Sequence, residues 1–136
     1  MAFRVRYRPN LSFVRNPIPN ERRVAARQGA LIRTIARRSI RKRKRPSNPG
    51  DPPTSRTGLL KNFLFYSWDP STQSVVVGPE KLFGVSSVDA PEALEFGGTS
   101  RDARGRRLKI EARPFMAPAL DQAKSKLPEL WKGAVN

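Results

Sequence analysis

Residues 21–45 read ERRVAARQGALIRTIARRSIRKRKR, a long stretch of the chain without proline. Apolar and small polar residues recur in it at the spacing of one helical face, opposite a face rich in arginine: Val24, Gln28, Leu31, Ile32, Ile35, Ser39 and Ile40. We therefore expect a helix from Glu21 to about Arg43, with Asn20 as its N-cap. At 1.5 Å per residue this helix is roughly 30–35 Å long, enough to cross a small sheet and project beyond it.

Downstream of the helix, turn-rich and apolar segments alternate. Residues 46–57, PSNPGDPPTSRT, contain four prolines and predict an exposed loop within the domain, or one that crosses a neighbouring subunit. Residues 58–68 are apolar enough for either a short helix or a buried strand, which periodicity does not separate. Residues 74–78, SVVVG, are β-branched and bounded by turn residues, so they predict a strand inside a sheet.

The last part of the chain predicts a hairpin followed by a helix. Residues 90–96 can form one helical turn, residues 99–105 the mobile polar tip, and residues 107–112 the returning strand. Pro118 suits the first position of a helix, which Pro128 should kink or divide. The sequence thus predicts an α+β fold, with a long N-terminal helix packed on a small, mainly antiparallel sheet, a C-terminal helix and extended arms.

The chain length indicates one domain with an extended arm before it. Arginines alternate with apolar residues over residues 3–8, so we expect residues 1–19 to form a basic extended arm or short strand, and residues 20–136 a single domain. The hydrophobic fraction is 38%, and 13 prolines interrupt the chain. Such a composition supports only a modest core, so oligomerisation is expected to supply further burial.

Composition removes most catalytic and membrane functions from consideration. The chain has no cysteine and no histidine, which excludes zinc sites of the usual ligands, disulfides and nucleophiles activated by histidine. Its 11 acidic residues are scattered singly, and a hydrolase built on carboxylates would need a cluster of them. We therefore expect no enzyme activity, no catalytic residue, no metal and no cofactor. No apolar run approaches the roughly 18–20 residues that span a bilayer, so we expect no membrane contact and synthesis in the cytoplasm.

Positive charge is concentrated in the first third of the chain. Residues 1–50 carry 15 Lys or Arg and one acid, a net charge of +14 out of the total +16. The densest cluster can contact phosphate, can dock on acidic surfaces of neighbouring proteins, or can be a solvated helix end. These candidate DNA-contacting or docking residues are Arg37, Arg38, Arg41, Lys42, Arg43, Lys44 and Arg45.

Four short motifs occur in a characteristic order: RTGLL at residues 56–60, VGP at 77–79, APEALEFGG at 90–98 and ARPFMAPAL at 112–120. In this order and spacing they resemble the tail-component family of tailed bacteriophages, which includes tail-completion and neck proteins. The resemblance covers about residues 20–132. Within the motifs, glycines are expected to serve turns or positive φ, the two phenylalanines to fill the core, and the arginine to cap or pair locally. The residues concerned are Gly58, Gly78, Phe96, Gly97, Arg113, Pro114 and Phe115.

The resemblance implies a structural virion protein that joins tail to head. It implies a ring, with six copies, whose partners are a head-side connector or head-closure protein and a tail terminator or tail tube protein, with phage DNA in the lumen as a further candidate. Its location would be the neck of the virion, after synthesis in the bacterial host cytoplasm. The alternative is a small basic DNA- or RNA-binding protein, which would explain the charge by phosphate neutralisation but leaves the order of the motifs without a reason.

Overall fold

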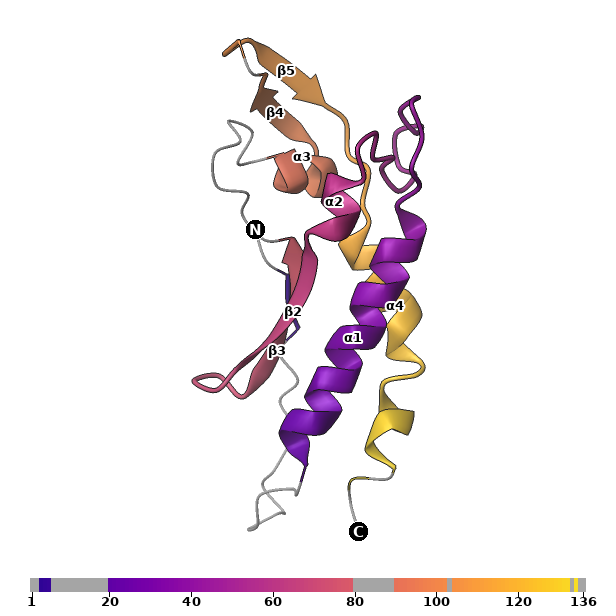
Figure 1. The fold of residues 1–136 in the computed structure, drawn as a ribbon, viewed down its shortest axis with the longest axis vertical. Helices are drawn as coiled ribbons and strands as arrows, with labels where there is room; N and C mark the ends of the chain where they lie inside the picture. The colour runs from indigo at the N-terminus through magenta and orange to yellow at the C-terminus, as the bar shows by residue number, and fades with distance from the viewer. Residues whose placement is uncertain (1–2, 6–19, 80–89, 103, 133, 135–136) are drawn as a thin grey trace.

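The computed structural model describes residues 3–5, 20–79, 90–102, 104–132 and 134. These residues form a mixed α+β fold, as the sequence predicts (Figure 1). The helices are α1 (Glu21–Ser39), α2 (Leu59–Asn62), α3 (Ala90–Phe96) and α4 (Met116–Lys124), followed by a 3-10 helix, η2 (Pro128–Trp131). The strands are β1 (Phe3–Val5), β2 (Leu64–Asp69), β3 (Ser74–Pro79), β4 (Gly98–Arg101) and β5 (Arg107–Ile110).

The long helix α1 buries the face that the sequence predicts but ends earlier. Its buried residues include Val24, Gln28 and Ile32, and α1 lies between the sheet and α4 (Figure 1). The helix ends at Ser39 and not near Arg43, because Ile40 adopts an extended backbone (φ −79°, ψ 112°) and is fully buried. The basic run that follows is therefore not a helix terminus, which corrects that expectation.

The start of α1 was predicted in position but not in mechanism. Asn20 precedes the helix, yet its side chain makes no capping hydrogen bond. Its backbone lies in the left-handed region with φ 74°, and its carbonyl oxygen accepts a hydrogen bond from the Val24 N–H at 3.0 Å. Asparagine tolerates this conformation better than most residues, which is a different reason for its position.

The described strands form two small antiparallel sheets. In the first, β3 is central in the order β1-β3-β2, as expected for the SVVVG segment. β1 belongs to the stretch expected to be an arm, and the remainder of that arm, residues 6–19, lies outside the described residues. The second sheet is the hairpin β4–β5, whose strand β4 includes residues 99–101 that were expected to be part of the polar tip. Residues 58–68 form a short helix and then a strand, which were expected as alternatives, and the strand is mostly exposed and not buried.

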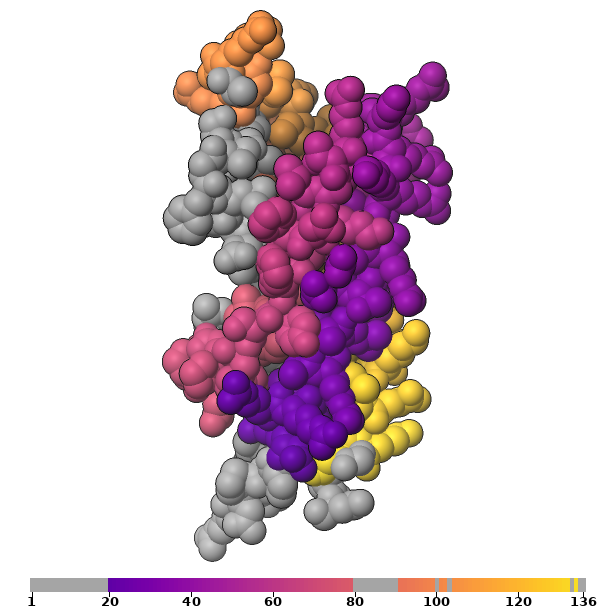
Figure 2. All heavy atoms as spheres, viewed as in Figure 1, coloured from indigo at the N-terminus to yellow at the C-terminus, as the bar shows by residue number. Residues whose placement is uncertain are grey.

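The core lies where α1, α4 and the first sheet meet. α4 begins at Met116, two residues before Pro118, and Pro128 begins the separate helix η2, so the division at Pro128 is confirmed. Figure 2 shows an elongated molecule, with the β4–β5 hairpin at one end of its long axis. The buried residues of the core are Ala25, Ile32, Ala36, Ile40, Leu64, Val75, Val77, Phe115, Met116, Ala119 and Ala123.

Candidate functional site

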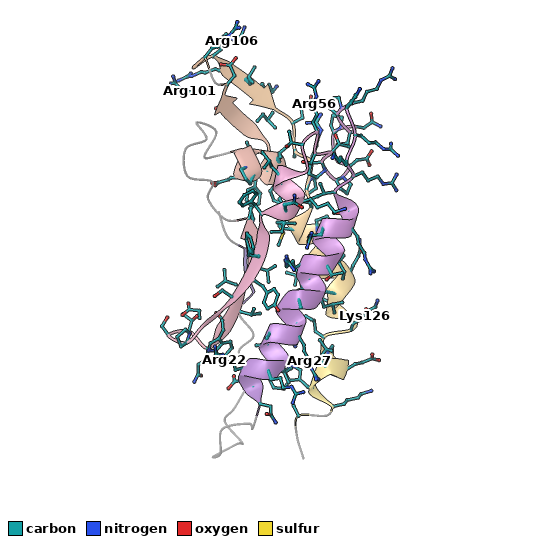
Figure 3. All side chains as sticks on the ribbon, viewed as in Figure 1. Arg22, Arg27, Arg56, Arg101, Arg106 and Lys126 are labelled. Carbon is teal, nitrogen blue, oxygen red and sulfur yellow. The ribbon has the colours of Figure 1, made fainter. Side chains whose placement is uncertain are left out.

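The structure divides the seven cations singled out in the sequence into four that line a groove and three that do not. Arg37 and Arg38 lie in the last turn of α1, and residues 41–45 follow the helix as an exposed, irregular segment. Figure 3 shows side chains with nitrogen tips extending from this end of α1. Four of the seven line one groove: Arg38, Arg41, Arg43 and Arg45. The other three, Arg37, Lys42 and Lys44, do not line it.

The groove has a volume of about 500 Å³ and lies between the end of α1 and the proline-rich loop. Besides the four arginines, its walls contain Ser47, Asn48 and one carboxylate, Asp51. Among the described residues the ion pairs are Arg106 with Asp102 and Lys124 with Asp121. The groove arginines are thus not neutralised by a carboxylate of the described chain, and they leave three excess positive charges after Asp51 is counted against them.

The proline-rich loop is largely exposed, as predicted, and hydrogen bonds hold it to its own chain. The Ser55 N–H donates to the Arg41 carbonyl at 2.9 Å, and Thr54 Oγ1 donates to the Arg45 carbonyl at 2.9 Å. At the loop's tip, the Gly50 N–H donates to the Ala112 carbonyl at 2.8 Å. Pro53 is fully buried. These contacts fix the shape of the groove before any ligand arrives.

The two longest motifs of the sequence meet in space around a buried carboxylate. Glu95 in α3 has only 4% of its surface exposed, and its side chain accepts three backbone hydrogen bonds from the first residues of α4 and the residue before it. Oε2 accepts from Phe115 at 2.9 Å and Met116 at 3.1 Å, and Oε1 accepts from Ala117 at 2.9 Å. A carboxylate at this position satisfies donors that a helix start leaves free and interacts favourably with the helix dipole.

Sequence reasoning gave Glu95 no role, although it stood inside a motif. The available signal was the acidic residue between apolar Leu94 and Phe96, which breaks the pattern of an ordinary buried segment. The structure also corrects the role of Phe96, which was expected in the core and is 63% exposed. Phe115 is fully buried, as predicted.

The other motif residues have structural positions. Gly58 (φ 82°) precedes α2 and donates its N–H to Ser55 Oγ, and Gly97 (φ 74°) turns the chain where a Cβ would lie 3.3 Å from the Ala112 nitrogen. Gly78 lies within β3 opposite Phe65, so it serves a strand and not the turn that was expected. The Arg113 side chain donates to the Ser47 carbonyl at 3.1 Å and to the Glu111 carbonyl at 3.2 Å, so its pairing is only partly local.

Pro114, between Arg113 and Phe115, is half-buried at the approach to α4. Its ring fixes one backbone dihedral where the chain passes from the irregular stretch after β5 into that helix. This placement agrees with the structural role expected of the motif.

The β4–β5 hairpin projects from the rest of the molecule (Figures 1 and 2). Leu108 in β5 is 47% exposed, and the other side chains of the hairpin whose exposure is described are exposed too, except for Asp102 and Ile110, which are half-buried. At its tip the Asp102 carboxylate accepts the N–H groups of Arg104 and Arg106, each at 2.9 Å. The pKa of Asp102 is lower than its ordinary value, and the hydrogen bond from the Arg106 backbone is the largest cause. Arg101 and Arg106 extend outward from this tip (Figure 3).

The described residues contain neither a metal-binding cluster nor a membrane-spanning helix. No three acidic side chains gather within them, and none of their helices is long and apolar enough to cross a bilayer. At the β2–β3 turn, hydrogen bonds from the side chain of Ser71 and then from that of Thr72 lower the pKa of Asp69 to about 2. That carboxylate organises a turn.

No protein family, curated protein or solved structure matches the chain. The interpretation of the site therefore depends on the groove, the motif residues and the hairpin themselves.

Proposed function

We propose that the chain is a structural virion protein of the bacteriophage neck, which forms a ring joining the tail to the head connector. Support comes from the order of its four motifs and from the way two of them interlock through Glu95 to form the base of the hairpin. A neck protein has no need of a catalytic centre. It needs a rigid body and surfaces that other subunits cover.

The projecting hairpin is the observation on which this proposal depends. A two-stranded hairpin is marginally stable alone in water, and β4–β5 exposes an apolar side chain, Leu108, in one of its strands. Phe96, at the base of β4, is also largely exposed. A second protein surface that covered these side chains would bury apolar area and stabilise the hairpin.

A ring supplies such a surface without another gene product. In closed cyclic symmetry one face of each subunit meets a different face of its neighbour, so a projecting hairpin on one copy can lie against the body of the next. We propose six copies, with a head-side connector or head-closure protein on one side and a tail terminator or tail tube protein on the other. The alternative, a small basic DNA- or RNA-binding protein, could use the exposed cations of the hairpin but gives no reason for its exposed Leu108 or for the order of the motifs.

Electron microscopy of particles made without this chain tests the function. We expect filled heads and free tails that stay separate, and joining restored when the parental chain is supplied from a plasmid. Leu108→Ser supplied in the same way should fail to restore joining, whereas Lys109→Ser, the adjacent exposed residue of β5, should restore it. Both side chains are exposed, so neither change should cost more than about 0.5 kcal/mol of folding stability. Intact virions in the absence of the chain would refute the proposed function.

A further inference from the structure

We propose that the arginine-lined groove at the end of α1 binds backbone phosphates of a nucleic acid strand, independently of base sequence. This inference goes beyond the assembly role and does not depend on it. It concerns the four residues Arg38, Arg41, Arg43 and Arg45, and excludes the three other cations that the sequence placed in the same cluster.

Alternate residues of the basic run face the groove. Arg41, Arg43 and Arg45 line it, and the intervening Lys42 and Lys44 do not. Arginine is the cation better suited to phosphate recognition, because its planar guanidinium presents a fork of donors that matches two phosphate oxygens. All three arginines of the run therefore line the groove, and both lysines lie outside it.

The arginines are available for a ligand, and the groove is already formed. No carboxylate of the described chain forms an ion pair with them. The backbone that carries them is tied to the proline-rich loop by the Arg41–Thr54 bridge and by the hydrogen bond from the Ser55 N–H to the Arg41 carbonyl. A ligand would therefore have to order side chains but not the loop, which reduces the entropic cost of binding.

One further wall residue lacks a partner. Ser47 Oγ is buried and makes no hydrogen bond within the described part of the chain, although the Ser47 carbonyl accepts one from Arg113. A buried hydroxyl without a partner costs free energy, and a phosphate oxygen or a water molecule in the groove would relieve that cost only after the Ser47 side chain had turned toward it. The single carboxylate, Asp51, offsets only one of the four guanidinium charges.

The chemistry of the walls favours a polynucleotide backbone over an acidic protein segment. The described lining residues include no aromatic ring, so bases have nothing to stack on, and contacts to phosphate alone carry no sequence information. A polynucleotide also releases condensed counterions on binding, a gain that scattered carboxylates on a folded protein give more weakly. The net charge of +16 would attract such a polyanion over a longer range.

The test compares two variants that remove equal charge from neighbouring positions. Binding of the full-length protein to a labelled mixed-sequence DNA oligonucleotide is followed by fluorescence anisotropy across a salt series. We expect Arg41→Gln with Arg43→Gln to weaken binding about tenfold or more at about 0.1 M salt and to reduce the salt slope by about 2. Lys42→Gln with Lys44→Gln should change affinity by less than about threefold, because these side chains lie outside the groove.

A second matched pair guards against misfolding of the loop. Arg38→Gln, in the last turn of α1, should weaken binding, and Arg37→Gln, its neighbour outside the groove, should not. Equal losses in the groove and control variants, or no DNA binding by the parental protein, would overturn the inference. So would polyglutamate that displaces DNA at equal charge concentration and loses affinity in the same groove variants, because the occupant would then be an acidic protein. The joining of heads to tails, scored by microscopy, reports separately on the proposed function.

Discussion

At the scale of single residues, adjacent positions in α3 reverse the usual rule of apolar inside and charged outside. Glu95 is buried while Phe96 is 63% exposed. The carboxylate is stable there because three backbone N–H groups donate hydrogen bonds to it. A phenyl ring in the same place would leave those three donors without partners. From residue type alone, Glu95 is expected outside and Phe96 inside. The sequence does not show the opposite arrangement, because the donors that stabilise buried Glu95 lie about twenty positions away along the chain.

Replacing this carboxylate by an amide tests its role. In Glu95→Gln the amide oxygen can keep the two bonds now made by Oε2, but the NH₂ group then faces the Ala117 N–H, donor against donor. We expect the free energy of unfolding to fall by about 1–3 kcal/mol, measured by urea denaturation. Glu92→Gln, an exposed change in the same helix, should stay within about 0.5 kcal/mol. Equal effects of the two substitutions would contradict the assignment.

At the scale of elements, a glycine in α1 allows the helix to lie unusually close to the first sheet. Gly29 lies on the buried face of the helix, and a Cβ built there would be 2.6 Å from Val75 Cγ2 and 3.1 Å from Tyr66 Cβ. Arg33 Nε, one turn further along, donates to the Leu64 carbonyl at 2.6 Å and so joins the helix to β2. The helix thus rests on the sheet more closely than a side chain at position 29 would allow.

Gly29→Ala should therefore destabilise the protein, although alanine is the better helix former. Overpacking a core costs about 1–3 kcal/mol, and the gain in helix propensity offsets about 1 kcal/mol of it. We expect a net loss of up to about 2 kcal/mol in thermal or urea unfolding. Thr34→Ala, on the exposed face of the same helix, provides the control and should raise stability slightly, since it gains propensity without meeting the sheet. A higher melting temperature for Gly29→Ala would show that the helix stands further from β3.

Elements were more predictable from the sequence than their ends and partners. Periodicity predicted α1, β3 and the α+β class, because each follows from local pattern. It placed the end of α1 four residues too late, since the burial of Ile40 depends on contacts with distant segments. The sequence predicted the seven cations of the basic cluster but not which of them line the groove. That depends on which side chains face the proline-rich loop, whose position is fixed by the bridge between Arg41 and Thr54.

At the scale of the whole molecule, the segment after α1 that carries the groove arginines lies toward the same end as the β4–β5 hairpin (Figure 1). The irregular stretch after β5 joins them, because the Ala112 carbonyl accepts the Gly50 N–H of the loop while the Arg113 N–H donates to the Leu94 carbonyl of α3. The main core lies elsewhere, between α1, α4 and the first sheet. One part of the molecule therefore contains the packed core, and the other carries the exposed groove and hairpin.

This division predicts two levels of local stability within one chain. Amides of β3, central in its sheet and buried against α1, should exchange hydrogen only when the whole domain unfolds, whereas the β4–β5 hairpin should open on its own. Hydrogen exchange on the dilute protein, followed by mass spectrometry or NMR, should show fast exchange at Leu108 and Ile110 and slow exchange at Val75 and Val77. In assembled particles the hairpin amides should become protected, because we propose that a neighbouring subunit covers that surface, while those of β3 should change little. Hairpin amides that are as slow as the β3 amides in the dilute protein would show that the hairpin needs no partner, and the main reason for placing it at a subunit interface would be lost.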